Sequence, residues 1–371
     1  MQRNTLSFKG QNIFIGIDVH KRSWTVTTIP EFGKQRTHVQ NASGKELIDF
    51  LNRHYPDGSY TAVYESGFTG MSTYYELEQY GIDCIVVNAA DVPTTQYEDL
   101  MKTDPIDSVK LAKSLKSGLL RGIYIRRKDD LDDRGLVRAR KAICKDLSRV
   151  RVRIKHLLMN NGVSVPERFD KSGHWPNAFT LWLRSEAKLL STTRRSLDVL
   201  LDEADSLRKD LLKATRIVRE LSRCEKYAAD VELMMIIPGI GMITAMTILT
   251  EVADFSRFGN ERQFASYMGL VPTSHSSGEK TVHGEKTFRG NKEIGPMIIE
   301  ACWRAIHEDD TLGTTYATLA KRMTPQKAIV RIARKMSNII LAVMKGRKKY
   351  EPFSASQDDP KTGTGENTIN N

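Results

Sequence analysis

The chain has 371 residues, a formal net charge of +11 and a pI near 9.4, so it suits two or three domains with sizeable cores. Its apolar stretches are short and interrupted, which argues against a membrane span. Four scattered cysteines form no CxxC pair, which argues against a zinc site or a disulfide framework. We therefore expect a cytoplasmic protein without a secretory leader, and the basic charge favours a nucleic-acid partner.

Residues 1–125 predict an α/β domain. Strands are expected at NIFIGIDVH, SWTVTTI, RTHVQN, SYTAVYES and GIDCIVVNA, and helices near 44–54 and after Gly70. Asp18 follows the apolar run 13–17, and Glu65 follows the run 61–64. A carboxylate on a buried strand is costly when unpaired, so both acids are candidates for a functional site.

The segment KTDPIDSVKLAKSLKSG, residues 102–118, places two more acids at the start of a helical pattern. One interpretation is structural: Asp104 is the N-cap, Pro105 is the first helical residue and Asp107 completes a capping box. The apolar stripe of this helix would then be Ile106, Val109, Ala112 and Leu115. The other interpretation is that the two carboxylates bind something, and the two interpretations are compatible.

Asp18, Glu65, Asp104 and Asp107 could meet at one edge of an α/β sheet. Their mutual repulsion would oppose this arrangement unless a divalent cation lay between them. Oxygen ligands suit Mg²⁺ or Mn²⁺, and sites with two ions about 3.5–4 Å apart act on phosphodiesters. The sequence therefore predicts a metal site made by these four acids.

Residues 126–225 predict a charged helical segment with two apolar seams. The longer seam is Leu197, Leu200, Ala204, Leu207, Leu211, Ala214, Val218 and Leu221; the shorter is Ile143, Leu147, Val150, Ile154 and Leu157. The longer seam predicts a coiled coil, which either joins copies of the chain or packs against the shorter seam in the same chain. The cations on the helix of the shorter seam either contact nucleic acid or form a solvated face. These cations are Arg138, Arg140, Lys141, Lys145, Arg149, Arg151, Arg153 and Lys155.

Residues 226–353 predict a third, mainly helical domain, and residues 354–371 a polar disordered tail. Pro238-Gly239-Ile240-Gly241 lies between two apolar helical stretches and predicts a helix-hairpin-helix. Such a turn either presents free amides to a backbone phosphate or simply connects two helices.

Several motifs together resemble one family. Asp18 in IGIDVHK, Glu65 in YESGFTG, and Asp104 with Asp107 in MKTDPIDS are similar to the Asp-Glu-Asp-Asp set of a RuvC-like, RNase H-type domain. FASYMGLVPTSHSSGEK and FRGNKEIGPMIIEACWRAI resemble the C-terminal domain of the DEDD insertion-sequence transposases, which are relatives of the pilin-gene invertases. The resemblance extends from about residue 12 to 348.

The resemblance implies a fold and a mechanism. The fold is a RuvC-like N-terminal domain, a coiled-coil middle and a serine-bearing transposase domain. The serine nucleophile falls on Ser277, with Ser276 as its neighbour and His275 and His283 as unassigned candidate bases. The implied reaction passes through a covalent phosphoserine link, and a carboxylate-bound metal assists at a composite site built from different subunits. Implied partners are double-stranded DNA at the element ends and target, a structured guide RNA, and further copies in a dimer or tetramer.

Two other functions agree with the same residues. A metal-dependent nuclease or Holliday-junction resolvase would use the four acids and water, and Ser277 would be structural. A non-catalytic nucleic-acid-binding protein would use only the helices and the hairpin. The resemblance implies a site-specific DNA recombinase, or transposase. A covalent protein–DNA adduct distinguishes this recombinase from both alternatives.

Overall fold

The computed structural model describes residues 7–101, 103–170, 175–277, 280–286 and 290–352, so the predicted tail lies outside the described residues. The chain separates into two compact units, Met1–Arg127 and Lys128–Asn371. We describe each unit by itself.

The first unit is a mixed α/β domain with one five-stranded sheet. Its strands have the order β3-β2-β1-β4-β5, in which β1 is antiparallel to β2 and parallel to β4. The strands are β1 (Asn12–Val19), β2 (Ser23–Pro30), β3 (Arg36–Asn41), β4 (Ser59–Glu65) and β5 (Asp83–Val87). The helices are α1 (Gly44–His54), α2 (Ser72–Gln79), a 3₁₀ turn η1 (Ala89–Asp91), α3 (Gln96–Leu100) and α4 (Asp104–Lys116). Each strand predicted from the sequence is present.

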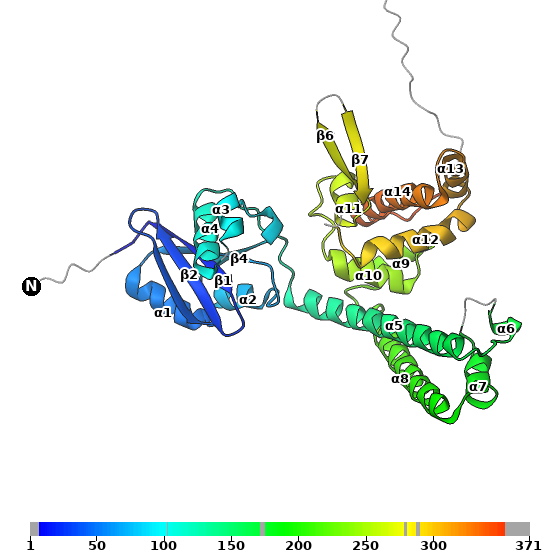
Figure 1. Ribbon diagram of the computed structural model, residues 1–371. Coiled ribbons are helices and arrows are strands. Elements are labelled where there is room, and N and C mark those ends of the chain that lie inside the picture. Colours follow the sequence, from blue (N-terminus) through cyan, green and yellow to red (C-terminus); the bar gives the residue numbers. More distant parts are fainter. Residues whose placement is uncertain (1–6, 102, 171–174, 278–279, 287–289, 353–371) are drawn as a thin grey trace, which may run out of the picture. The chain divides into compact units, whose positions relative to one another are not determined.

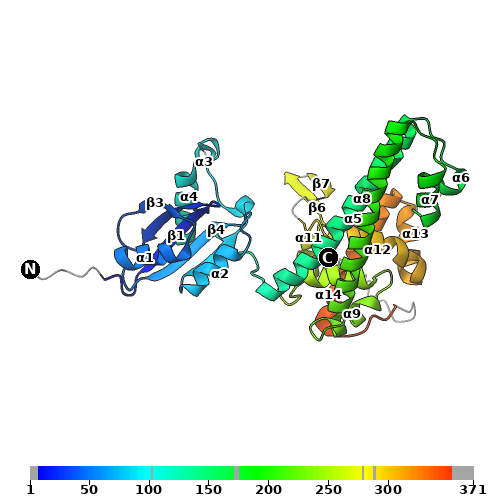
Figure 2. The same ribbon diagram turned by 90° about the horizontal axis from the view of Figure 1, so that it is seen from below.

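Helices cover both faces of this sheet (Figure 2). Ile13, Ile15 and Ile17 of β1 are fully buried in the core that includes residues of α1 and α2. Side chains alternate between the faces of a strand, so Gly16 and Asp18 belong to the opposite face, where α4 packs. On β4, Val63 packs with Leu111 of α4, and the same alternation assigns Glu65 to the face of Val63. Asp18 and Glu65 therefore lie on neighbouring parallel strands, on the face that α4 covers.

The second unit is helical except for a two-stranded hairpin, β6 (Pro272–Ser277) and β7 (Lys280–Lys286), among its described residues. Its first half contains α5 (Lys128–Asn160), α6 (Glu167–Asp170), α7 (Asn177–Ser185) and α8 (Ser191–Leu221). Its second half contains α9 (Ala228–Met235), α10 (Met242–Val252), α11 (Glu261–Tyr267), α12 (Ile294–Glu308), α13 (Asp310–Ala320) and α14 (Pro325–Gly346). The mixed α/β first region and the mostly helical remainder confirm the fold class at this level.

The two predicted seams pack against each other within one chain. Helices α5 and α8 lie side by side (Figures 1 and 2). Leu147, Val150 and Ile154 of α5 share a buried cluster with Leu197 and Leu201 of α8. Leu201 is buried here in place of the predicted Leu200, which is half-buried, and the apolar face of α8 is covered by α5, in agreement with the intrachain alternative.

A second cluster forms the core of the C-terminal half and includes residues of α9, α10, α12 and α14. It continues to α5 through Val137 and to α8 through Val218. Among the described residues, no helix is long and apolar enough to cross a membrane.

Candidate active site and nucleic-acid contacts

Helix α4 reaches the acidic end of the sheet because β1 carries a glycine beneath it. A Cβ atom at Gly16 would lie 2.1 Å from the Ser108 carbonyl oxygen and 2.5 Å from the Ala112 amide nitrogen. Real Cβ atoms do not approach that closely, so only glycine permits this contact. The buried Ser108 hydroxyl also lies 2.9 Å from the Thr27 hydroxyl of β2, which fixes the helix against a second strand.

This close approach corrects the apolar stripe predicted for α4. The residues of α4 that are buried are Ser108, Lys110, Leu111, Ala112 and Ser114, whereas Ile106 and Val109 are only half-buried. At the contact with Gly16 the side chains of α4 are small, those of Ser108 and Ala112, because a bulky residue there would hold the helix away from the strand. The prediction was right for Ala112, which is buried, and wrong for Ile106 and Val109, because it assumed that the largest apolar residues mark the buried face.

The capping interpretation of the two aspartates is also wrong in detail. The N-cap is Thr103, so Asp104 is the first helical residue and Pro105 the second. The Asp104 carboxylate lies 3.3 Å from Nε2 of His20, and the Asp107 carboxylate accepts a hydrogen bond from Lys110. Both acids therefore face other site residues, although they still lie in the first turn, where the helix dipole favours a negative charge.

The four predicted acids form two pairs in the structure, each joined by a basic side chain. His20 Nε2 lies 3.1 Å from Asp18 Oδ2 and 3.3 Å from Asp104 Oδ2. Lys110 Nζ lies 3.1 Å from Asp107 Oδ1 and 3.8 Å from Glu65 Oε1. The sequence analysis identified the acids but missed both bases. The signal was available in part, because His20 follows Asp18 by two residues and Lys110 follows Asp107 by one helical turn.

The Asp18 carboxylate is in an unfavourable electrostatic environment. Burial raises its pKa above the ordinary value, the nearby charge of His20 lowers it, and the charges of Asp104 and Asp107 raise it further. A cation bound nearby would stabilise the ionised form of the Asp18 carboxylate.

The donor atoms here fit a divalent cation. Asp18, His20 and Asp104 each offer one ligand atom, and these atoms all lie within 4.8 Å of one another. Carboxylate oxygens suit Mg²⁺ or Mn²⁺, and Mn²⁺ also accepts an imidazole. The donor set of this site is therefore suited to a divalent metal.

The predicted nucleophile lies on the hairpin of the second unit. Ser277 is the last residue of β6, and its backbone pairs with Lys280 of β7 (Figure 1). Ser276 pairs with Thr281, and His275 with Val282. Gly278 and the side chains of the hairpin lie outside the described residues.

A buried polar network lies where the chain leaves this hairpin. Glu251 of α10 is 1% exposed, and its carboxylate accepts hydrogen bonds of 2.6 and 2.9 Å from Arg138 of α5. Asn291, five residues after the end of β7, donates to the same carboxylate at 2.9 Å. Burial would raise the pKa of Glu251, but the hydrogen bonds from Arg138 and Asn291 outweigh burial and lower it. The network therefore ties the exit of the hairpin to two helices, α5 and α10.

The predicted helix-hairpin-helix is formed by α9, the turn at 236–241 and α10. Gly239 has φ +77°, and a Cβ atom there would lie 2.2 Å from the Ala301 carbonyl oxygen, so this position requires glycine. Its amide donates a 2.9 Å hydrogen bond to Glu308, whose carboxylate also pairs with Arg304 at 2.6 Å. A carboxylate of the chain itself thus accepts a hydrogen bond from one amide of the turn, whereas the phosphate interpretation concerns the amides at the start of α10, Met242–Val252.

Many cations of α5 have partners within the chain. Besides Arg138, Lys141 pairs with Glu293 at 2.7 Å and Arg153 with Glu203 at 3.7 Å. Arg140 donates to Thr215, and Arg149 pairs with Asp146. These cations are therefore paired within the chain, so they form neither a wholly solvated face nor a face whose charges are all free to bind nucleic acid.

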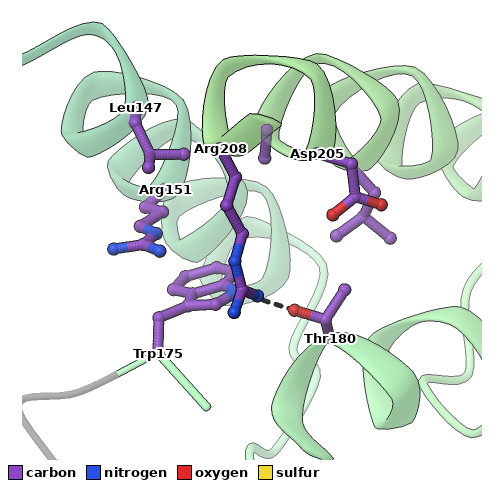
Figure 3. Close-up of a pocket in the computed structure, with 8 residues that line it drawn as sticks. Leu147, Arg151, Trp175, Thr180, Asp205 and Arg208 are labelled. Carbon is purple, nitrogen blue, oxygen red and sulfur yellow. Dashed lines mark hydrogen bonds between the residues drawn. The ribbon is translucent and has the colours of Figure 1, made fainter. Parts of the chain in front are cut away.

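Arg151 instead lies in a small pocket between α5 and α8 (Figure 3). Its guanidinium carbon is 5.5 Å from the centre of the Trp175 ring, and the Trp175 indole donates a 3.0 Å hydrogen bond to Thr180. Arg208 lines the same pocket, and it adds to burial in lowering the pKa of Arg151. Two guanidinium groups beside one indole are a combination that also binds nucleic acid bases and phosphates.

Comparisons with known proteins agree with this arrangement. Residues 15–161 match the family model of the DEDD transposases of the IS110 type, and residues 231–317 match the transposase IS116/IS110/IS902 family. A Sinorhizobium fredii protein named as a transposase, y4qE, is 28% identical over 306 residues, which are 78% of this chain and 71% of that protein. The transposase for insertion sequence element IS1533 of Leptospira borgpetersenii is 24% identical over 68% of this chain and 73% of its own.

A third relative matches over a shorter region. The pilin gene-inverting protein of Moraxella bovis is 30% identical over 131 residues, which are 32% of this chain and 38% of that protein. The mixed sheet, its acidic site and these matches define a transposase, an enzyme of DNA recombination. The chain belongs to the DEDD-type insertion-sequence transposases, the family that includes IS110.

Proposed function

We propose that this transposase is a site-specific recombinase that cuts and rejoins DNA through a phosphoserine link at Ser277. The observation that carries the proposal is the convergence of Asp18, Glu65, Asp104 and Asp107 from two strands and one helix, each within 3.8 Å of a basic side chain. Four acids on one face of a mixed sheet agree with the RuvC-like fold that the sequence resemblance implies. Acids held together in this way are suited to binding Mg²⁺ or Mn²⁺.

In the proposed reaction the Ser277 oxygen bonds to phosphorus and the bond between phosphorus and the leaving-strand oxygen breaks. Water takes up the serine hydroxyl proton and water protonates the departing oxygen, so the step balances. A serine needs help for this attack. A divalent ion held by Asp18 and its neighbours would polarise the phosphodiester and stabilise the charge that develops on it. The phosphoserine bond conserves the energy needed to rejoin the strand.

The proposed partners follow from the reaction. Double-stranded DNA at the element ends and at the target supplies the strands, and a structured guide RNA selects them. The net charge of +11 supports polyanionic partners. Rejoining several strands requires more than one nucleophile, so we propose a homo-oligomer, a dimer or a tetramer.

The test is a trapped protein–DNA adduct. Ser277→Ala removes one hydroxyl, so it should bind DNA as the wild type does and form no adduct. Ser276→Ala is the matched control and should retain the adduct, because neighbouring residues of a strand point to opposite faces. Peptide mapping after nuclease trimming should place the nucleotide on Ser277.

The same experiment tests the main alternative. All four acids lie between residues 18 and 107, so the metal site needs no residue of the second unit. A nuclease that uses water as its nucleophile would need only such a site. Strand cleavage by Ser277→Ala at the wild-type rate would establish water as the attacking group and overturn the phosphoserine proposal.

A further inference from the structure

Lys110 is a buried ammonium inside the acidic site. Its residue is 9% exposed, and Nζ donates a 3.1 Å hydrogen bond to Asp107 and lies 3.8 Å from Glu65. Lysine is almost never this buried unless its charge is paired. Lys113, one turn further along α4, is exposed, so burial at position 110 is a property of this site and not of the helix.

The ammonium divides the site into two unequal halves. One half, made by Glu65 and Asp107, already holds a positive charge, which is hydrogen-bonded to Asp107 at 3.1 Å and forms an ion pair with Glu65 at 3.8 Å. The other half, made by Asp18 and Asp104, is joined only by His20, whose side chain is 49% exposed. The second half offers three ligand atoms within 4.8 Å of one another, whereas the Glu65–Asp107 half offers two carboxylates that already share the Lys110 ammonium.

We propose that Lys110 is a built-in cation which fills the Glu65–Asp107 half, so that this chain binds one divalent ion at the Asp18–Asp104 half and not two. The inference rests on the metal site of the proposed function. In a two-ion site, the ions lie about 3.5–4 Å apart. A second ion at Glu65 and Asp107 would have to displace the Lys110 ammonium from its two carboxylates and leave it close to a divalent charge. Lys110 thus sets the number of ions.

The experiment counts Mn²⁺ ions on the intact chain by the electron paramagnetic resonance signal of the free ion. The wild type should bind one ion per chain. Lys110→Gln keeps the length of the side chain and removes its charge, so the variant should bind two. Lys113→Gln removes an exposed charge from the same helix and should still bind one. Asp18→Asn should abolish binding, whereas Glu65→Gln should leave the count at one.

The outcomes separate this inference from the proposed function. Two ions on the wild type, or one ion on a folded Lys110→Gln chain, would overturn the role of Lys110 and leave the metal site intact. No ion on the wild type would remove the metal site itself and the inference with it. Circular dichroism establishes that each variant is folded. If Lys110→Gln does not fold, the wild-type count and the Glu65→Gln count still decide the question.

Discussion

Gly16 on β1 and Ser108 on α4 are in such close contact that a Cβ atom on the glycine would lie 2.1 Å from the serine carbonyl oxygen. This contact sets the distance between the helix that carries Asp104 and Asp107 and the strand that carries Asp18.

Gly16→Ala should therefore damage both the fold and the metal site. Overpacking of this kind costs about 1–3 kcal/mol, and relief of the clash moves α4 away from β1. We expect a lower melting temperature and weaker Mn²⁺ binding. Gly122→Ala is the matched control in the same unit, because its nearest atom would be 3.6 Å away, an ordinary contact. Equal Mn²⁺ affinity in Gly16→Ala and wild type would show that the contact does not position the site.

Asp18→Asn should stabilise the chain when no metal is present. The pKa of Asp18 is raised above 3.8, first by burial and then by the neighbouring acids, so its ionised form is destabilised in the folded state. The fold therefore loses stability as the pH rises from 3.8 through the raised pKa. In a chelator at pH 7 the variant should melt above the wild type, and the difference should vanish as the pH falls below 3.8.

The exposed Asp49 provides the control for that measurement. Asp49→Asn removes a surface carboxylate that is paired with Lys45 and should change the melting temperature little at either pH. Addition of Mn²⁺ should reverse the order of stability, because only the wild type gains from binding. An Asp18→Asn chain that melts below the wild type in the chelator would contradict the repulsion inferred here.

Arg138→Met should destabilise the second unit. The change leaves the Glu251 carboxylate, 1% exposed, without its bidentate partner. Removal of one partner of a buried ion pair typically costs about 3–5 kcal/mol, and we expect a loss at or below the lower end because Arg138 is 47% exposed and Asn291 still donates to Glu251. Arg149→Met on the same helix breaks an exposed pair with Asp146 and should cost less than about 1 kcal/mol. Thermal unfolding followed by circular dichroism compares the stabilities of the two variants. Equal decreases in stability would mean that the Glu251 network contributes no more than an exposed ion pair.

Leu201→Ala should weaken the pairing of α5 and α8. Leu201 is 1% exposed in their shared cluster, and such a truncation costs roughly 2–5 kcal/mol. Leu212→Ala, at a residue 61% exposed on the same helix, should be nearly neutral. Light scattering on both variants also tests the predicted self-association. A loss of oligomer mass in Leu201→Ala with helicity intact would mean that this seam joins copies of the chain.

The sequence predicted the strands well because their apolar runs are bounded by polar turns. It also predicted the four acids, since a carboxylate at the end of a buried strand is unusual enough to be noticed. It did not predict which residues of α4 face the sheet, because the buried face depends on Gly16, a residue of another element. Lys110 was missed for a related reason: a lysine in a helix suggests solvent, and only the fold places it between two carboxylates.

The hydrogen bond between the Gly239 amide and Glu308 bears on how salt would affect DNA binding at the α9–α10 turn. The affinity of a protein for DNA falls steeply with salt because condensed cations leave the DNA when side-chain charges of the protein neutralise its phosphates. Here a phosphate at Gly239 would exchange with an anion that is covalently part of the chain. Arg304, 77% exposed and already paired with Glu308, would then be shared between the two anions. The Glu308 carboxylate displaced in this way would take up a mobile cation, which offsets a cation that the DNA releases, so binding at this turn would depend only weakly on ionic strength.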